Sequence, residues 1–273
     1  SIYGILNGTT NYILGKLEQG MEYKDALKQA QDLGFAEPDP TFDVEGMDAS
    51  QKLVILSSLA FNSKIEDKIH TEGISKLKRI DIQYASELGY AVKLLAIAKL
   101  AGGKLELRVH PTMIPRSHEL ASVNNELNAV YVVRKNIKEV MLYGRGAGKL
   151  PTATVIVGDI ISSAKRVENK TSLPAVRYFN KTSIKDMDEV SSRYYFRYQA
   201  VDKPGVLAKI SEILGKNNIS IAGVWQKEQD KDIVPLIMTT HKAKEKDVKK
   251  ALEDINSLEI IKGSTIMMRI EDL

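Results

Sequence analysis

Hydrophobic positions recur every three to four residues in the first part of the chain, which is the spacing of amphipathic helices. This spacing predicts helices over residues 9–19, 22–34 and 48–61. Thr9 or Thr10 is available as the N-cap of the first helix, and Gly34 stands where the second can end in a left-handed residue. The third helix is apolar nearly all round, so we expect it to be buried.

Later segments have the composition of strands, because they are rich in Val, Leu, Ile and Tyr. Strands are expected at residues 104–114, 128–135 and 139–144, and residues 80–103 mix a strand with another helix. Residues 151–167 return to helical spacing, with Pro151 near the first turn. We therefore predict an α+β domain over residues 1–167, in which helices cover a mixed β-sheet. Residues 168–193 carry little periodicity and are the expected linker.

The last part of the chain, residues 194–273, has the clearest order of elements. The segments "YYFRYQAV", "ISIAGVWQK", "DIVPLIMTTH" and "GSTIMMRI" read as strands. Two amphipathic segments, "PGVLAKISEILGKNN" and "KEKDVKKALEDIN", read as helices between them. The resulting order, βαββαβ, predicts a ferredoxin-like domain.

Composition excludes several classes of protein. The chain has 273 residues, a formal net charge of +4 and no cysteine, so disulfides, thiolate zinc sites and a cysteine nucleophile are ruled out. Basic residues are not clustered with aromatic ones, which argues against a nucleic-acid partner. The longest apolar run, "LVILSSLAF", is too short to cross a membrane. The four histidines lack metal-ligand spacing, and we expect no metal site and a cytoplasmic protein.

An acidic stretch over residues 34–52 is the strongest sign of chemistry. It holds five carboxylates and then one cation, namely Glu37, Asp39, Asp43, Glu45, Asp48 and Lys52. A calcium loop does not fit, because the ligand spacing and the closing glutamate of an EF-hand are lacking. An exposed i,i+4 salt bridge between Asp48 and Lys52 stays open. A pocket for a small zwitterion is favoured, with carboxylates for its amine and the lysine for proton transfer.

The turn "DKPGVLA", together with "NNISI", resembles the ACT regulatory domain. Its residues are Asp202, Gly205, Val206, Leu207, Asn218 and Ile219. The resemblance implies a small effector such as an amino acid, for which threonine is our candidate, and at least a dimer of this chain. A glycine beside a helix N-terminus suits such a ligand, because free N–H groups there attract a carboxylate.

Three further motifs, "GILNGTTNYIL", "GFAEPDPTFDVEGMDASQK" and "GRGAGKLPTATVIVGDI", together resemble homoserine dehydrogenase over residues 1 to about 165. The resemblance implies reversible oxidation of L-homoserine to L-aspartate 4-semialdehyde with NADP or NAD, within threonine, methionine and isoleucine biosynthesis. It implies that Glu37 grips the substrate amine, that Asp48 contacts the substrate, that Lys52 transfers the proton and that Asp43 holds this network.

The same resemblance places a set of small residues near the nicotinamide or the substrate: Gly8, Thr9, Gly34, Gly144, Gly146 and Gly148. Members of the family carry a dinucleotide-binding domain upstream, and we find no G-x-G-x-x-G fingerprint here. The segment "GRGAGK" is no P-loop either, since Tyr143 replaces the first glycine. We therefore expect substrate and regulatory domains that are inactive alone. The alternative is a non-catalytic module for amino-acid sensing or oligomerisation.

Overall fold

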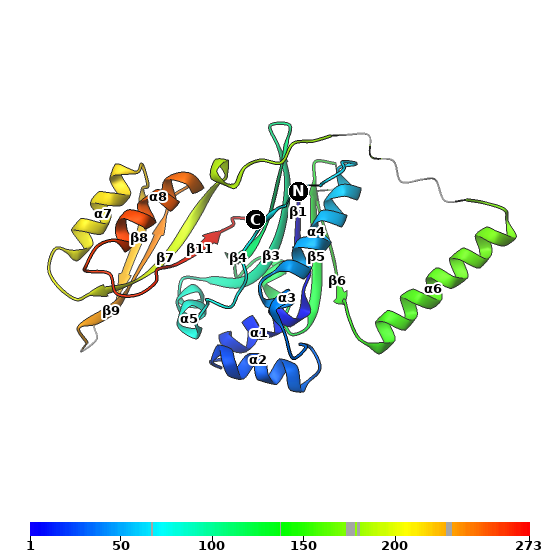
Figure 1. Cartoon of the computed structure of the whole chain (residues 1–273), viewed down its shortest axis with the longest axis horizontal. Coiled ribbons are helices and arrows are strands. Elements are labelled where there is room, and N and C mark those ends of the chain that lie inside the picture. Colours follow the sequence, from blue (N-terminus) through cyan, green and yellow to red (C-terminus); the bar gives the residue numbers. More distant parts are fainter. Residues whose placement is uncertain (67, 137, 173–177, 179–180, 228–230) are drawn as a thin grey trace.

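One continuous β-sheet runs through the molecule, and helices cover it (Figure 1). The computed structural model describes residues 1–273 except 67, 137, 173–177, 179–180 and 228–230. The strands are hydrogen-bonded in the order β6-β5-β1-β3-β4-β11-β7-β9-β8, with β2 beside β4 and β10 beside β7. The prediction of a mixed sheet followed by a βαββαβ unit is confirmed.

The first half of the sheet is built around a strand that the sequence pattern did not reveal. This strand, β1 (Ile2–Ile5), is buried and pairs with β3 on one side and β5 on the other. Four residues are too few for alternation to be recognised, so only the neighbouring strands identify it. The remaining strands are β2 (His70–Thr71), β3 (Tyr90–Ala101), β4 (Lys104–Pro115), β5 (Leu127–Arg134) and β6 (Lys138–Arg145).

Helices of the first half pack on one face of this sheet in a shared hydrophobic core. They are α1 (Gly8–Glu18), α2 (Tyr23–Asp32), α3 (Thr41–Val44), α4 (Met47–Ala60) and α5 (Arg79–Glu87). Two expectations were wrong. The N-cap of α1 is Asn7 rather than a threonine. Helix α4 is not buried all round, because Ile55 and Leu59 are exposed on its outer face.

The second half follows the predicted order from β7 (Ser191–Val201) to β11 (Ile266–Ile270). Between them lie α7 (Val206–Lys216), β8 (Ile221–Gln226), β9 (Ile233–Thr240), β10 (Ala243–Lys244) and α8 (Glu245–Asn256). Alternate residues of β7 face opposite cores, since Tyr194 packs with α7 and α8 while Tyr195 packs with the first half. The strand starts three residues before the predicted boundary.

The two halves meet where β11 pairs in parallel with β4, with Arg269 opposite Thr112. Buried ion pairs reinforce this junction. Arg197 on β7 donates to both carboxylate oxygens of Asp81 on α5, at 2.5 and 3.2 Å. Both side chains are at most 2% exposed. The halves are therefore joined by backbone and by charge, not by a linker alone.

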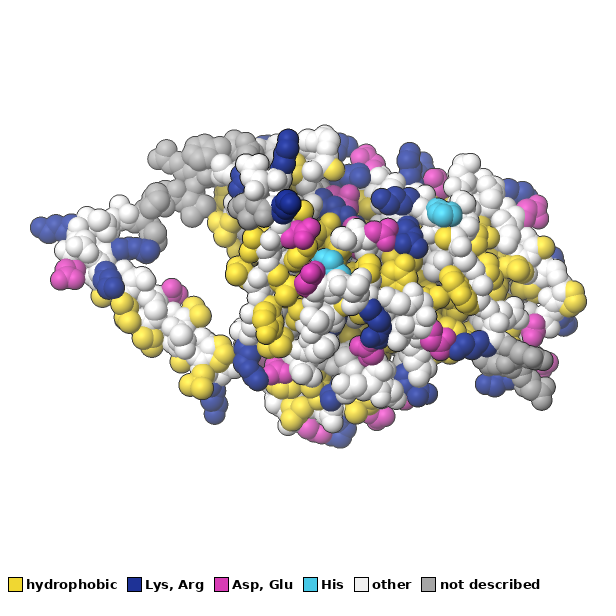
Figure 2. All heavy atoms as spheres, turned by 180° about the vertical axis from the view of Figure 1, so that it is seen from behind, with side chains coloured by type: hydrophobic (Ala, Val, Ile, Leu, Met, Phe, Trp, Pro, Cys, Tyr) yellow, Lys and Arg dark blue, Asp and Glu magenta, His cyan; other side chains and the backbone are white. Residues whose placement is uncertain are grey.

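Helix α6 (Lys149–Glu168) stands apart from both halves in Figure 1 and has no buried residue. Apolar side chains lie along it (Figure 2), and they include Leu150, Val155, Ile156, Val157, Ile160, Ile161 and Val167. The predicted linker falls partly outside the described residues. Its last part has structure of its own. Ile184 forms a β-bridge with Leu105, and a short 3₁₀ helix, η2 (Met187–Glu189), precedes β7.

The buried Asp81–Arg197 pair gives a prediction for stability. Asp81→Ala leaves the Arg197 guanidinium buried without its carboxylate. We therefore expect the free energy of unfolding, measured in urea, to fall by about 3–5 kcal/mol. The double variant Asp81→Leu/Arg197→Met should recover most of the loss, because no charge remains buried.

The matched control is Asp32→Ala, which breaks an exposed pair with Lys28. It should change the free energy of unfolding by less than about 0.5 kcal/mol. Equal losses for the Asp81 and Asp32 variants would contradict a structural role for the buried pair.

Candidate functional site

Asn7 is the centre of the polar cluster at the end of β1. Its Oδ1 accepts a hydrogen bond from the Thr10 backbone N–H at 2.9 Å, which caps α1. This fixes the amide orientation, so Nδ2 faces two carboxylates and donates to Asp43 Oδ1 at 2.7 Å and Asp48 Oδ2 at 2.9 Å. One amide therefore ties the start of α1 to α3 and to the start of α4.

Lys52 lies one helical turn after Asp48 and completes the cluster. Its Nζ donates to Asp48 Oδ2 at 2.7 Å and to the Leu6 carbonyl at 3.1 Å. The Lys52 side chain is 48% exposed and that of Asp48 is 20% exposed. The i,i+4 salt bridge is therefore present with a half-exposed lysine, and the pair has additional partners, Asn7 and the Leu6 carbonyl, at the β1–α1 turn. An ammonium has three N–H donors, so one remains for a ligand.

The other acidic residues of residues 34–52 do not all join this cluster. Asp39 Oδ1 accepts the Thr41 backbone N–H at 3.1 Å. Hydrogen bonds from the side chain and the backbone of Thr41 lower the pKa of the Asp39 carboxyl. Glu37 is exposed, and its backbone carbonyl accepts a hydrogen bond from the Gln31 side chain. Glu45 is half-buried. The structure thus separates a cluster of Asp43 and Asp48 from a capping residue and an exposed glutamate.

Two of the predicted small residues connect α1 to its surroundings. Thr9 is buried, and its hydroxyl donates to the Phe35 carbonyl at 2.5 Å, just after Gly34. Gly34 has a φ of +75° and follows α2, as predicted. A Cβ on Gly8 would lie 2.6 Å from the Glu126 carbonyl oxygen, so only glycine lets α1 approach the start of β5.

The glycines of "GRGAGK" are spread over two elements instead of sharing one loop. Gly144 lies within β6, in the strand expected over residues 139–144, and pairs with Asn128. A Cβ on Gly146 would lie 2.8 Å from the Asn128 side chain. Gly148 has a φ of +116° and is the N-cap of α6. Packing and backbone conformation explain the glycines at 146 and 148.

The glycines expected near a cofactor differ in the space around them. Gly34 and Gly144 face open space, which leaves room for a ligand beside the α1 turn, whereas Gly8 and Gly146 face protein atoms. No strand–helix turn of the described residues carries a phosphate-binding glycine fingerprint. Within the same residues no group of three or more His, Asp or Glu is placed to hold a metal ion.

The predicted effector residues fall into two places. A cavity of about 200 Å³ lies at the Asp202–Leu207 turn and is lined by Asp202, Gly205, Val206 and Leu207, among others. Asn218 and Ile219 do not line it, because they follow the opposite end of α7, about 16 Å away along an eleven-residue helix. Within one chain, Asn218 is therefore not beside a ligand at this turn.

Asn7 is the residue of this cluster that the sequence did not single out. The signal was present, since asparagine is a preferred N-cap and precedes "GTT". What the sequence does not reveal is that its amide nitrogen donates to Asp43 and Asp48, which lie 36 and 41 positions further along the chain.

Asn7→Asp gives a prediction with a clear pH dependence. The variant keeps the N-cap but puts a third carboxylate between Asp43 and Asp48, so like-charge repulsion should raise the pKa of the introduced carboxyl on folding. A raised folded-state pKa stabilises below the unfolded value and loses that stability as pH rises. We expect the loss in unfolding free energy relative to the wild type to be small near pH 4 and larger at pH 7, as measured in urea at both values.

Asn7→Ala is the control, because it removes the cap and both donated hydrogen bonds without adding charge. Its loss should depend less on pH. A pH-independent loss for Asn7→Asp would show that the three carboxylates do not interact.

No helix of the described chain is both long and apolar enough to span a bilayer.

Comparisons with known proteins agree with this geometry. The model of the Homoserine dehydrogenase family matches residues 1–161, and that of the ACT domain matches residues 194–260. Homoserine dehydrogenases of Neisseria gonorrhoeae and Pseudomonas aeruginosa are 44% and 41% identical over 100% and 99% of this chain. The chain spans 65% and 64% of their lengths.

The fold is shared as well. The crystal structure of a homoserine dehydrogenase from Thiobacillus denitrificans superposes with a TM-score of 0.91 at 41% identity, over 99% of this chain and 64% of that one. The family model covers more than half of the chain and includes the Asn7 cluster. The chain therefore belongs to the homoserine dehydrogenase family and carries an ACT domain.

Proposed function

We propose that this chain forms the substrate-binding and regulatory parts of an enzyme that interconverts L-homoserine and L-aspartate 4-semialdehyde with NADP or NAD. The observation that carries this proposal is the cluster of Asn7, Asp48 and Lys52, which lies inside the region matched by the family model. It offers a fixed carboxylate and a partly exposed ammonium at the end of a buried strand.

Lys52 is the proton-transfer group in this proposal. Oxidation of the homoserine alcohol removes a hydride from carbon and a proton from the hydroxyl, and the nicotinamide, when bound, accepts the hydride. In its neutral form Lys52 takes the hydroxyl proton, and in the reverse reaction its ammonium returns it. Asp48 stabilises that ammonium at 2.7 Å, and Asn7 holds Asp48 in place at 2.9 Å.

Substrate recognition uses the acidic groups around Lys52. Asp43 maintains the cluster through Asn7, and Asp48 has an exposed edge for substrate. Glu37 is exposed and free to approach an ammonium group, on a segment that Thr9 ties to α1 through Phe35. A charge-assisted contact of this kind suits the amine of an amino acid.

The cofactor is held mainly outside this chain. A hyperthermophilic archaeal homoserine dehydrogenase mutant, 28% identical over 64% of this chain, has been solved in complex with NADPH. Exposed apolar residues on α4 and α6 offer surfaces against which a dinucleotide-binding domain can pack. The residues proposed beside the nicotinamide are Gly8, Thr9, Gly34, Gly144, Gly146 and Gly148. We expect this chain alone to be inactive.

Regulation is assigned to the ACT domain. The cavity at the Asp202–Leu207 turn lies at the N-terminus of α7, where N–H groups attract the carboxylate of an amino acid such as threonine. Feedback requires that the effector binds two states of the protein with different affinity. We place that difference in the pairing of ACT domains within a homo-oligomer, in the cytoplasm.

Lys52→Ala tests the proposed chemistry. Loss of a positioned acid–base group should lower kcat of the full-length enzyme by about 10²–10⁴-fold while changing KM much less. The measurement is the rate of NADP reduction with homoserine. Lys28→Ala is the control, because Lys28 also pairs with an aspartate four residues away but lies on the exposed face of α2.

Near-normal turnover of Lys52→Ala would remove this lysine from the mechanism. A full-length protein that binds amino acids but oxidises no homoserine would instead identify a non-catalytic sensing module.

Gly205→Val tests the regulatory site. Gly205 has a φ of +87°, so valine must either shift the turn or crowd the cavity. We expect threonine binding, measured by calorimetry, to be lost while homoserine binding is kept.

Gly263→Val is the matched control, because Gly263 has a φ of +86° in the same domain and does not line the cavity. If both variants bind threonine like the wild type, the turn is not the effector site. If no variant and no wild-type protein binds it, the domain serves in assembly alone.

A further inference from the structure

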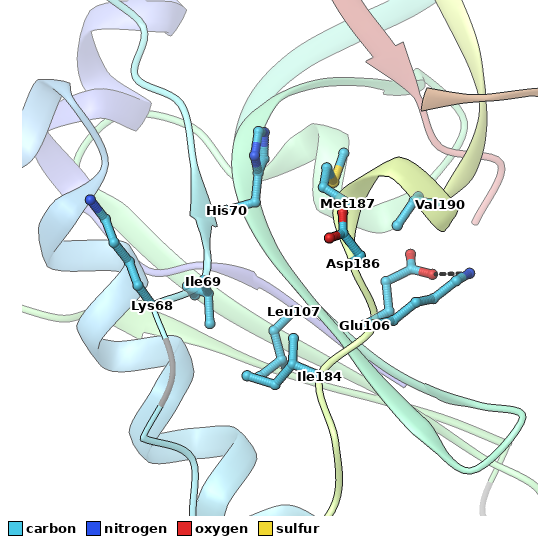
Figure 3. Close-up of a pocket in the computed structure, with 10 residues that line it drawn as sticks. Lys68, Ile69, His70, Glu106, Leu107, Ile184, Asp186, Met187 and Val190 are labelled. Atoms are coloured by element: carbon cyan, nitrogen blue, oxygen red, sulfur yellow. Dashed lines mark hydrogen bonds and ion pairs between the residues drawn. The ribbon is translucent and has the colours of Figure 1, made fainter. Parts of the chain in front are cut away.

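A larger cavity lies at the seam between the two halves, away from both sites described above. Its volume is about 440 Å³. Three segments form it: residues 68–70, the start of β4, and the segment 184–190 that leads into β7 (Figure 3). This volume is within the range of about 300–1,000 Å³ that is usual for small-molecule sites.

The floor of this seam cavity is apolar. Ile69, Leu107 and Val190 are buried there, and Ile184 and Met187 are partly exposed. Such a floor suits a hydrocarbon side chain of a ligand, because burying it removes apolar surface from water.

The rim carries charges of both signs. Figure 3 shows Lys68 on one side of His70 and the Asp186 carboxylate on the other. Asp186 Oδ1 accepts the Asp188 backbone N–H at 2.8 Å, which leaves Oδ2 for a ligand. Among the described residues, Lys68 forms no ion pair or hydrogen bond. The rim therefore offers an ammonium group that is unpaired among the described residues and a carboxylate with one oxygen left for a ligand.

The wall between these contacts is held in place before any ligand binds. The buried Glu106 carboxylate accepts from Arg108 at 3.0 Å and from Lys185 at 3.3 Å. The backbone of Leu105 exchanges two hydrogen bonds with residues 183 and 185, at 2.9 and 2.7 Å. A preformed site loses less conformational entropy when a ligand binds.

We propose that the seam cavity binds a free α-amino acid with a medium-sized apolar side chain. Its carboxylate meets Lys68, its ammonium meets Asp186, and its side chain lies on the floor of Ile69 and Leu107. A dianionic ligand such as a phosphate ester would face Glu106 and Asp186, and a simple amine would face two lysines. The zwitterion alone matches both signs of charge.

The location gives such a ligand access to the junction of the two halves. His70 lines the cavity, and its Nε2 lies 2.7 Å from Glu72 Oε1. Glu72 in turn accepts hydrogen bonds from Arg269 of the ACT domain at 2.8 and 3.0 Å. The proposal does not rest on the dehydrogenase activity, since it concerns binding at a separate place.

Calorimetry on the full-length protein tests the proposal, with L-leucine, L-methionine and L-isoleucine as probes. N-acetyl-leucine and leucinamide are the matched ligands that lack one charge each. We expect at least one free amino acid to bind. Its N-acetyl and amide derivatives, as N-acetyl-leucine and leucinamide are for leucine, should bind about ten-fold more weakly or not at all.

Variants assign the binding to this cavity. Asp186→Asn and Lys68→Met should each weaken binding about ten-fold, because each replaces a charge-assisted contact. Met187→Trp should abolish binding by filling the cavity. The controls Asp188→Asn and Lys64→Met make the same charge changes outside the lining and should bind normally.

Gly205→Val separates this site from the one at the ACT turn, and it should leave binding of the probe unchanged. The proposal is overturned if no probe binds at millimolar concentration. It is also overturned if Gly205→Val removes binding while the three cavity variants retain it.

Discussion

Arg269 joins the two halves of the molecule, and the geometry of the junction depends on it. Its guanidinium is 1% exposed and lies between Glu245 of the ACT domain and Glu72 of the first half. The Nε donates to Glu245 at 2.9 Å, while the terminal nitrogens donate to Glu72 at 2.8 and 3.0 Å. Burial alone raises the pKa of Glu72, but hydrogen bonds from His70 and Arg269 hold it well below its ordinary range. A buried arginine of this kind is stable only when carboxylates of both halves are present.

The parallel pairing of β11 with β4 makes the sheet continuous across this junction. Backbone hydrogen bonds therefore connect β11 to β4, and β4 to β3 and β1. Two residues after the end of β1 lies Asn7, which donates to Asp43 and Asp48, and Asp48 accepts from Lys52. A contiguous element therefore connects the ACT domain to the candidate active site, and both ends of it are fixed by buried polar contacts.

Apolar residues are also exposed at the surface, on helices away from this junction. Helix α6 exposes apolar residues along its length, and the outer face of α4 exposes Ile55 and Leu59 near Lys52. These surfaces flank the part of the molecule where a cofactor domain is proposed. The chain spans 65% and 64% of the lengths of the Neisseria and Pseudomonas relatives, so about a third of each lies outside the part that it matches. Covering α4 would also exclude water from Lys52, which strengthens its electrostatic contacts.

The sequence by itself determined the elements whose signals are local. Helical spacing located α1, α2 and α4, alternation located the ACT strands, and motif resemblance selected Asp48, Lys52 and the Asp202–Leu207 turn. It could not determine β1, which is too short to show a period, nor the exposure of α4, whose apolar sequence suggested full burial. It also did not show that Asn7 holds Asp43 and Asp48, or that Asn218 is remote from the turn at Gly205. Those facts depend on contacts between residues far apart in the chain, and only the tertiary structure brings such residues together.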